Sequence, residues 1–257
     1  GVRANRTTRG HRFLGSQKIK LNHVDDYLRE LKKNFVIADC QSRKEKIVSE
    51  LREAVPQNLH VLPDTELTEL VIYLNEYPTV ICGDFMDRFL NLPDEVLITV
   101  MRRHQKYFAV VDEANKLQPH FLTVINTKGD PTGKIKDGHE RVLKSRLEDA
   151  VFFWKSDSEK LLTDKLTELE GVLFQENLGS YRAKVDRLEI LCAALSEDAH
   201  LSSAAKLCKA DLTTETVREF PELQGIIGGL CARNQGHPEA VWRAICEHYK
   251  PVSFDDE

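Results

Sequence analysis

The chain has 257 residues, a hydrophobic fraction of 41% and a charged fraction of 30%, which is the composition of a globular protein with an apolar core. No apolar run approaches the roughly 18 to 20 residues that a membrane span needs, and no charged-then-apolar leader indicates a signal peptide. The formal net charge of −5 excludes a global basic field, so any nucleic-acid contact must come from a local basic patch.

The termini and the cysteines bear on how the chain occurs in the cell. It opens at Gly1 on a basic segment and ends on the acidic SFDDE, so we expect it to be a piece of a longer protein. Its six cysteines form no CxxC pair, which argues against a structural zinc site. Most lie in apolar contexts, which favours buried, reduced thiols in a reducing, cytoplasm-like compartment.

Helical and strand patterns alternate in the first half of the chain. After a basic, Gly-punctuated loop with a short strand, apolar spacing predicts a helix over HVDDYLRELKKNF with Asn22 as its N-cap. Further helices are predicted to start at Asp39, at Asp64 and at Pro93. TVICGDF predicts a buried strand, and KYFAVVD and PHFLTVIN predict a hairpin. The first half is therefore predicted to be α+β.

The second half follows the turn-rich segment NTKGDPTGK, after which we expect only helices. We place a domain boundary between about residues 128 and 160. The Gly-rich GIIGG at Gly225–Gly229 lacks the Lys and Ser/Thr of a phosphate-binding loop. We interpret it as a helix-packing motif, because glycine lets backbones approach closely.

Motifs of common catalytic sites are absent, including the P-loop, GxGxxG, GxSxG and HExxH. The helical half invites comparison with metal-dependent phosphohydrolases of the HD type, which need His and Asp ligands together, but no His–Asp dipeptide occurs. Lys209, Ala210 and Asp211 occupy the most plausible position, and we interpret Asp211 as a hydrogen-bonded structural residue. The nine histidines show no ligand spacing. We predict no catalytic residue and no metal site.

Several longer motifs occur together in one order. They are TTRGHRFLG, FVIADCQSRKEKI, PDEVLITVMRRHQKYFAVVD, ERVLKSRLEDAVFFW, LFQENLGSYRAKVDRL and KADLTTETVREFPELQG. In this order they resemble the β chain of bacterial-type heterotetrameric glycyl-tRNA synthetase, and the resemblance covers nearly the whole chain. Collinear blocks of this length are far more specific than a single short motif.

The resemblance implies an α+β fold in two domains. Residues 1–145 resemble the editing domain of the phenylalanyl-tRNA synthetase β chain, and residues 146–257 resemble a degenerate, helical HD-like domain that is truncated after Tyr249. KADL stands where an active HD hydrolase carries its His–Asp pair, so hydrolase chemistry is not expected.

The resemblance also implies a function. We expect a tRNA-binding and scaffolding part of glycine–tRNA ligase, with glycine tRNA and the α chain as partners and with no membrane or DNA contact. The α chain would hold the catalytic site and use ATP and Mg, so this fragment itself would need no cofactor and would not aminoacylate alone. The expected location is the cytoplasm of a bacterium or an organelle of bacterial descent.

Candidate RNA-binding residues fall into three groups that combine cations with neighbouring polar or aromatic side chains. They are Arg6, Arg9, His11 and Arg12; then Arg102, Arg103, His104, Gln105, Lys106 and Tyr107; then Arg141, Lys144 and Arg146. Each group has a structural alternative. Cations in the last turn of a helix stabilise its dipole, as Arg102 and Arg103 would, and Arg146 could pair with Glu148 or Asp149.

Two other functions stay open at this point. A subunit-interaction module would contact the α chain or order the β chain, and its mixed, net acidic charge is compatible with that role. Hydrolytic editing of mischarged tRNA would need a water-positioning site, for which the sequence shows no defined constellation.

Overall fold

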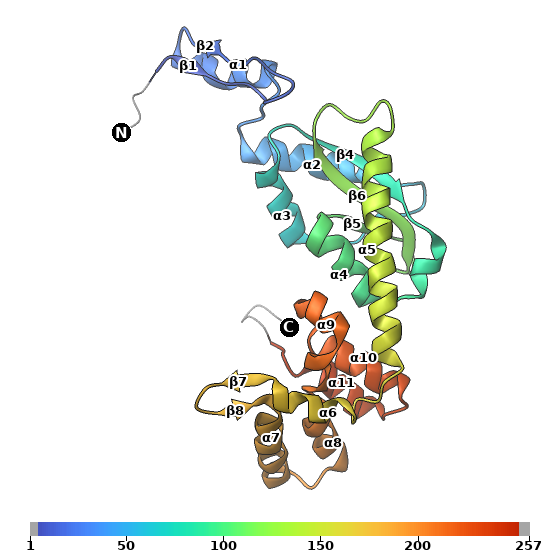
Figure 1. Ribbon diagram of the computed structural model, residues 1–257. Helices are drawn as coiled ribbons and strands as arrows, with labels where there is room; N and C mark the ends of the chain where they lie inside the picture. Colours follow the sequence, from blue (N-terminus) through green and yellow to red (C-terminus); the bar gives the residue numbers. More distant parts are fainter. Residues whose placement is uncertain (1–4, 252–257) are drawn as a thin grey trace. The chain divides into compact units, whose positions relative to one another are not determined.

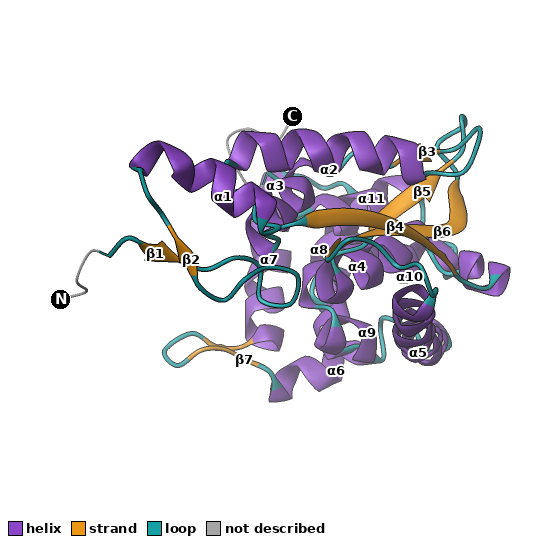
Figure 2. Ribbon diagram, turned by 90° about the horizontal axis from the view of Figure 1, so that it is seen from above, coloured by secondary structure: helices purple, strands orange, loops and turns teal. Residues whose placement is uncertain are grey.

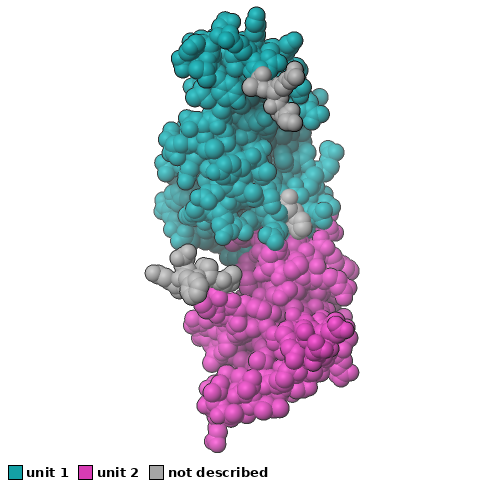
Figure 3. Space-filling view, turned by 90° about the vertical axis from the view of Figure 1, so that its left-hand side faces the viewer, with its two compact units in different colours: residues 1–94, 100–146 teal, residues 95–99, 147–257 magenta. Residues whose placement is uncertain are grey.

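A computed structural model describes residues 5–251, apart from the side chain of His104. The chain divides into two compact units, residues 1–94 with 100–146 and residues 95–99 with 147–257, here called the first and second unit (Figure 3). The first unit contains helices and a four-stranded sheet, and the second is mostly helical, so the predicted α+β class is confirmed. Within the described residues, no helix is long and apolar enough to cross a membrane.

The elements from the N-terminus to the long helix α5 are shown in Figure 1. In chain order they are β1 Thr7–Thr8, β2 Ile19–Lys20, the 3-10 helix η1 Val24–Asp26, α1 Tyr27–Lys33, α2 Cys40–Ala54, β3 His60–Val61, α3 Thr65–Leu74, β4 Pro78–Asp84, η2 Asp87–Asn91, α4 Asp94–Gln105, β5 Phe108–Val111, β6 Leu117–Asn126 and α5 Lys134–Ser158. The division between the units falls inside α5, between Arg146 and Leu147.

The four-stranded sheet has the order β3-β5-β6-β4, with antiparallel neighbours throughout. The predicted hairpin of β5 and β6 is confirmed. Strand β4 pairs with β6 over its whole length, from Pro78 opposite Asn126 to Asp84 opposite His120. Since β4 is the last strand in this order, its outer edge is open to side chains from other elements.

The two faces of this sheet carry different cores. On one face, Phe108 and Leu122 cluster with Ile47 of α2 and Val71 of α3. Phe121 directly precedes Leu122 in β6, so its side chain points to the opposite face of the sheet. Helices lie on both sides of the strands, with α2 on one side and α5 on the other (Figure 2). Both faces are covered, which explains why all four residues of the central strand β5 are apolar and buried.

Side-chain caps explain where several helices start. The carboxylates of Asp39 and Asp64 accept hydrogen bonds from the backbone N–H groups of Ser42 and Leu67, so both predicted starts are confirmed. The first helix differs from its prediction. It begins as a 3-10 turn capped by the side chain of His23 rather than by Asn22.

The second unit contains the remaining elements. They are α6 Lys165–Glu168, η3 Leu169–Gly171, β7 Leu173–Gln175, β8 Gly179–Ser180, α7 Tyr181–Leu195, α8 Ala199–Leu207, η4 Ala210–Thr213, α9 Glu215–Glu219, η5 Pro221–Leu223, α10 Ile226–Asn234 and α11 Glu239–Glu247. The expectation of an entirely helical second half is wrong, because β7 and β8 form a small antiparallel hairpin. The assignment of the two units to an editing-like and an HD-like domain stays a prediction.

Glycines and cysteines of the second unit bear on two further predictions. GIIGG lies at the start of α10, and a Cβ on Gly229 would lie 2.7 Å from the carbonyl oxygen of Trp242, so its helix-packing role is confirmed. All six cysteines of the chain are free thiols. Only Cys208 and Cys231 are buried, so the prediction of mostly buried thiols is wrong.

Candidate nucleic-acid interface

Arg9, His11 and Arg12 of the first candidate group lie on a compact turn between β1 and β2, and Arg6 directly precedes β1. The backbone N–H of His11 donates to the carbonyl of Asn34 at 2.9 Å, and Gly10 donates to Ser16 at 2.8 Å. A Cβ on Gly15 would lie 2.3 Å from the Asn34 carbonyl oxygen, so this approach requires glycine. The turn is therefore held in one conformation by the end of α1.

His11 is the structural centre of this turn rather than a surface group. Its side chain is 1% exposed, and its Nδ1 accepts hydrogen bonds from the backbone N–H groups of Phe13 and Leu14. Its prediction as an RNA contact is therefore corrected, because a buried ring offers no face to a polymer.

The other members of the first group are exposed. Arg6, Arg9 and Arg12 all reach solvent, and no ion pair among the described residues involves them. Beside them Phe13 is 83% exposed, and the Arg12 guanidinium lies 5.4 Å from the centroid of its ring. Sequence reasoning missed Phe13, although an aromatic residue next to an arginine in a Gly-flanked turn is a usable signal. These three exposed cations and the exposed ring can bind phosphates and stack on a base.

Arg102, in the second group, forms ion pairs with two carboxylates. Its Nε lies 2.5 Å from Asp64 Oδ2, and its Nη2 lies 2.6 Å from Glu66 Oε2. Hydrogen bonds to Asp64 and then Glu66 raise the pKa of this guanidinium above its usual value. Arg102 thus ties the end of α4 to the start of α3, and its role as a phosphate contact stays a prediction.

The remaining members of this group surround the end of α4. Lys106 ends the helix in the left-handed region, with φ 58°, and its Nζ donates to the carbonyl of Arg103 at 2.6 Å. Arg103 is exposed and Gln105 is half-buried. Tyr107 is 1% exposed and therefore does not present its ring to RNA as predicted. The predicted contact of His104 lies outside the described residues.

Tyr107 brings the second group close to the helix that carries the third. Its ring stacks on Phe121 with centroids 4.4 Å apart, and its hydroxyl lies 2.7 Å from His139 Nδ1 in α5. Burial raises the pKa of Tyr107 and lowers the pKa of His139, so both are neutral partners. The third group follows on the same helix, where Arg141 and Lys144 are exposed and Arg146 is half-buried; all three stay predictions.

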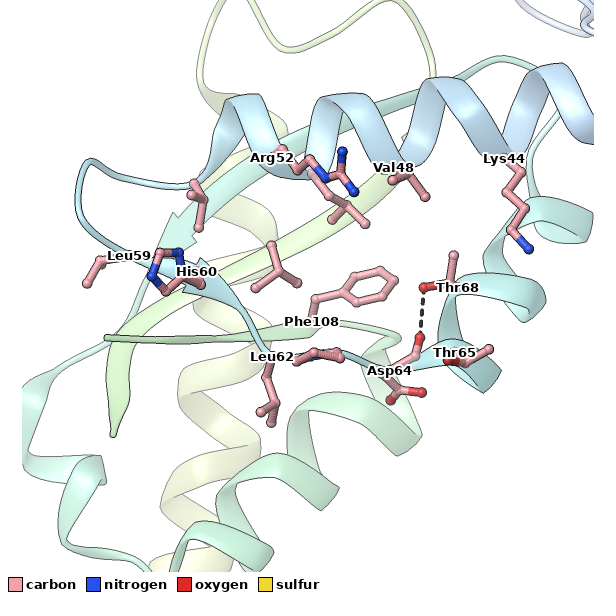
Figure 4. A pocket seen from close by; sticks show the side chains of 14 residues that line it. Lys44, Val48, Arg52, Leu59, His60, Leu62, Asp64, Thr65, Thr68 and Phe108 are labelled. Atoms are coloured by element: carbon pink, nitrogen blue, oxygen red, sulfur yellow. Dashed lines mark hydrogen bonds between the residues drawn. The ribbon is translucent and has the colours of Figure 1, made fainter. Parts of the chain in front are cut away.

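A groove of about 740 Å³ lies between α2, the β3–α3 connection and β5 (Figure 4). Phe108 and Val48 point into it, and Lys44 and Arg52 stand along the α2 side. The carboxylate of Asp64 is already occupied as a helix cap and as the partner of Arg102. The groove suits an apolar or planar group with cations at its rim, and no nucleophile–base pair is visible in it.

The side chains of Lys209 and Asp211 in the second unit are buried and hydrogen-bonded within that unit. Asp211 is completely buried, and its Oδ2 accepts hydrogen bonds from the N–H groups of Gly225 and Gly228 at 2.6 and 3.2 Å. The prediction of a hydrogen-bonded structural aspartate is confirmed, although it lies in a 3-10 turn. Lys209 is also buried, with its Nζ 2.7 Å from His248 Nε2.

A cluster of potential metal ligands occurs on β4 and β6, where the sequence indicated none. Atoms of Cys82, Asp84 and His120 lie within 4.8 Å of one another. The register that brings His120 opposite Asp84 could not be read from the sequence, because these residues belong to different strands.

Comparison with known proteins gives one consistent result. A family model described as glycyl-tRNA synthetase beta subunit matches residues 1–257. The glycine–tRNA ligase beta subunit of Thermodesulfovibrio yellowstonii is 42% identical over 264 residues, which cover 100% of this chain and 39% of that protein. Those of Rickettsia typhi and Geobacter sulfurreducens are 42% and 43% identical, each over 98% of this chain and 38% of the relative. The chain thus spans about two fifths of the length of these relatives.

Proposed function

Because the chain belongs to the glycyl-tRNA synthetase beta subunit family, we propose that it is the part of a glycine–tRNA ligase β chain that holds tRNA. In this proposal the α chain binds glycine and ATP with Mg, and the β chain positions the tRNA for it. The chain alone is then expected not to aminoacylate. Relatives named glycine–tRNA ligase beta subunit match the whole of the chain, which supports a role in glycine–tRNA ligation.

The observation that carries the proposal is the surface of the N-terminal turn. Arg9 and Arg12 are exposed without a carboxylate partner among the described residues, and Phe13 stands 83% exposed beside them. Phe13 thus leaves its ring accessible on a turn that is held by backbone hydrogen bonds. Arginines supply phosphate contacts through counterion release, and the ring supplies a stacking platform for an unpaired base.

The test is binding of a glycine tRNA transcript to the chain, measured against salt concentration. The variant Arg9→Ala/Arg12→Ala/Phe13→Ala should bind at least about tenfold more weakly, since one stacked base alone contributes roughly 1–3 kcal/mol. The dependence of log affinity on log salt should become shallower by roughly 1 to 2 units, because up to two phosphate contacts are lost.

A matched control removes equal charge and one aromatic ring elsewhere. Arg218 and Arg243 are exposed arginines that pair with Glu215 and Glu239, and Tyr73 is 73% exposed. The variant Arg218→Ala/Arg243→Ala/Tyr73→Ala should bind tRNA as the wild type does. Equal affinity and equal salt dependence of the two triple variants would overturn the assignment of tRNA binding to the N-terminal turn.

A second candidate function, a subunit-interaction module, is supported by the outer face of α7. Ile190, Leu191 and Leu195 are 70%, 59% and 83% exposed, and exposed apolar patches of this kind mark protein contacts. The partner would be the α chain or another part of the β chain. Pull-down with the isolated α chain tests it: retention that is lost in Leu191→Asp supports this role, and no retention counts against the α chain as partner.

A further inference from the structure

Three side chains with metal-binding atoms converge at the end of the β4–β6 pair. Cys82 and Asp84 are two residues apart on β4 and therefore point to the same face of the sheet. His120 on β6 is the direct cross-strand partner of Asp84, so its side chain shares that face. The sheet register thus fixes a thiol, a carboxylate and an imidazole together, with their ligand atoms within 4.8 Å of one another.

The surroundings show that this cluster attracts positive charge. His120 Nδ1 lies 2.7 Å from Asp84 Oδ1, and Lys136 of α5 places its Nζ 2.7 Å from Asp84 Oδ2. Glu140, one helical turn later, accepts a hydrogen bond from the backbone N–H of Asp84 at 2.8 Å through Oε1. The Lys136 ammonium also lies 3.5 Å from Glu140 Oε1. One ammonium therefore faces two carboxylates beside a thiol and an imidazole.

We propose that Cys82, Asp84 and His120 bind a divalent metal of the Zn²⁺ class at this edge of the sheet. Sulfur and imidazole ligands together select Zn²⁺ or Co²⁺ over Mg²⁺ or Ca²⁺, which prefer oxygen ligands alone. Water would complete the coordination, because Asp84 is exposed to solvent. The metal takes the position that the Lys136 ammonium holds on Asp84, and Lys136 turns to solvent.

The geometry needs only small movements. Zinc lies roughly 2.0 to 2.3 Å from its ligands, so ligand atoms around it stand about 3.3 to 3.8 Å apart. The ligand atoms lie within 4.8 Å of one another, so side-chain rotations that move them by about 1 Å bring them to this spacing. On binding, the Cys82 thiol releases its proton to solvent and forms a metal–thiolate bond, and no oxidation or reduction takes place. The metal would join the edge strand β4 to its neighbour β6.

The test uses the 257-residue chain, freed of metal with a chelator and titrated with Co²⁺. A thiolate-to-cobalt charge-transfer band, with the intense visible bands of a tetrahedral site, should grow to one Co²⁺ per chain and disappear on addition of Zn²⁺. Cys82→Ala should abolish the charge-transfer band, and His120→Ala should weaken binding by at least about tenfold, as losses around metal sites do.

Two further variants make the experiment decisive. Lys136→Met removes the competing ammonium and should tighten Co²⁺ binding several-fold, whereas an ion-pair cluster without metal-binding capacity would show no such gain. Cys40→Ser removes an exposed thiol outside the cluster and should leave the titration unchanged. Absence of the charge-transfer band in the wild type, or its survival in Cys82→Ala, would overturn the proposal.

Discussion

Buried Asp211 and half-buried His248, both in the second unit, carry unusual protonation states. Burial raises the pKa of Asp211 to about 6, and Oδ1 has no hydrogen-bond partner among the described residues. Burial lowers the pKa of His248 to about 4, and the Lys209 ammonium acts in the same direction. His248 Nδ1 lies 2.7 Å from the carbonyl of Ile245, so Nδ1–H donates there and Nε2 accepts from Lys209. The imidazole is therefore neutral.

These two groups should affect stability in opposite directions as pH changes. The native state holds the Asp211 proton more tightly than the unfolded chain, so this stabilisation is present below about pH 4 and lost as pH rises through about 6. His248 loses its proton more easily when folded, so its stabilisation is present above about pH 6.5 and lost as pH falls through about 4. Both effects share one pH window.

Asp211→Asn should therefore expose the pH dependence of His248. The free energy of unfolding of the variant minus that of the wild type should rise as pH increases from about 4 to about 6. The rise should reach up to about 3 kcal/mol, at about 1.4 kcal/mol per pKa unit. Urea unfolding at a series of pH values measures it. His248→Gln is the matched variant. Its free energy of unfolding minus that of the wild type should fall over the same rise in pH. A profile of Asp211→Asn parallel to that of the wild type would contradict the raised pKa.

Single residues were the hardest features to predict from the sequence. Arg102 looked like a free cation at a helix end, but its partners Asp64 and Glu66 lie on a helix that the chain folds back beside it. His11 looked like part of a basic surface, although its ring is buried in the turn. Charge and spacing predict which residues are polar, whereas only the tertiary fold decides which of them are already paired.

At the scale of elements, close packing of α10 against α11 depends on one glycine. A Cβ on Gly229 would lie 2.0 Å from Cys246 Sγ and 2.7 Å from the Trp242 carbonyl oxygen, and the backbone oxygen cannot turn away. Gly229→Ala should lower the free energy of unfolding by roughly 1–3 kcal/mol, as overpacking does. Denaturant unfolding of the chain measures the loss.

Gly138 supplies the control for this substitution, since it lies in α5 with nothing within 4 Å of an added Cβ. Gly138→Ala should stabilise the chain by roughly 0.5–1 kcal/mol, because alanine loses less backbone entropy in a helix. Equal stability of Gly229→Ala and Gly138→Ala would contradict the close approach of α10 to α11 at Gly229.

Most helices and the central hairpin could be predicted, because local chemistry specifies them. Asp39 and Asp64 are caps that act within three residues, and the apolar runs in β5 and β6 reflect the burial of these strands. The β7–β8 hairpin was missed because strands of two or three residues carry too little alternation to read. The metal-ligand cluster was missed for another reason, since it depends on strand register rather than on any one segment.

At the scale of the whole chain, the division into two units falls within a continuous helix. The sequence predicted a boundary near this place, but a helical pattern continues through α5 and gives no linker signal. Each unit has its own buried apolar residues, including Leu122 in the first unit and Ile227 in the second. Separate cores favour separate cooperative unfolding, because contacts within a unit are lost together.

Calorimetry of the chain should therefore show two unfolding transitions. Leu122→Ala and Ile227→Ala each remove a fully buried side chain, at a cost of roughly 2–5 kcal/mol. Each variant should lower the midpoint of a different transition and leave the other nearly unchanged, whereas Leu70→Ala, at a position 41% exposed, should move neither by a comparable amount. A single transition that both core variants lower equally would show that α5 couples the two units into one cooperative structure.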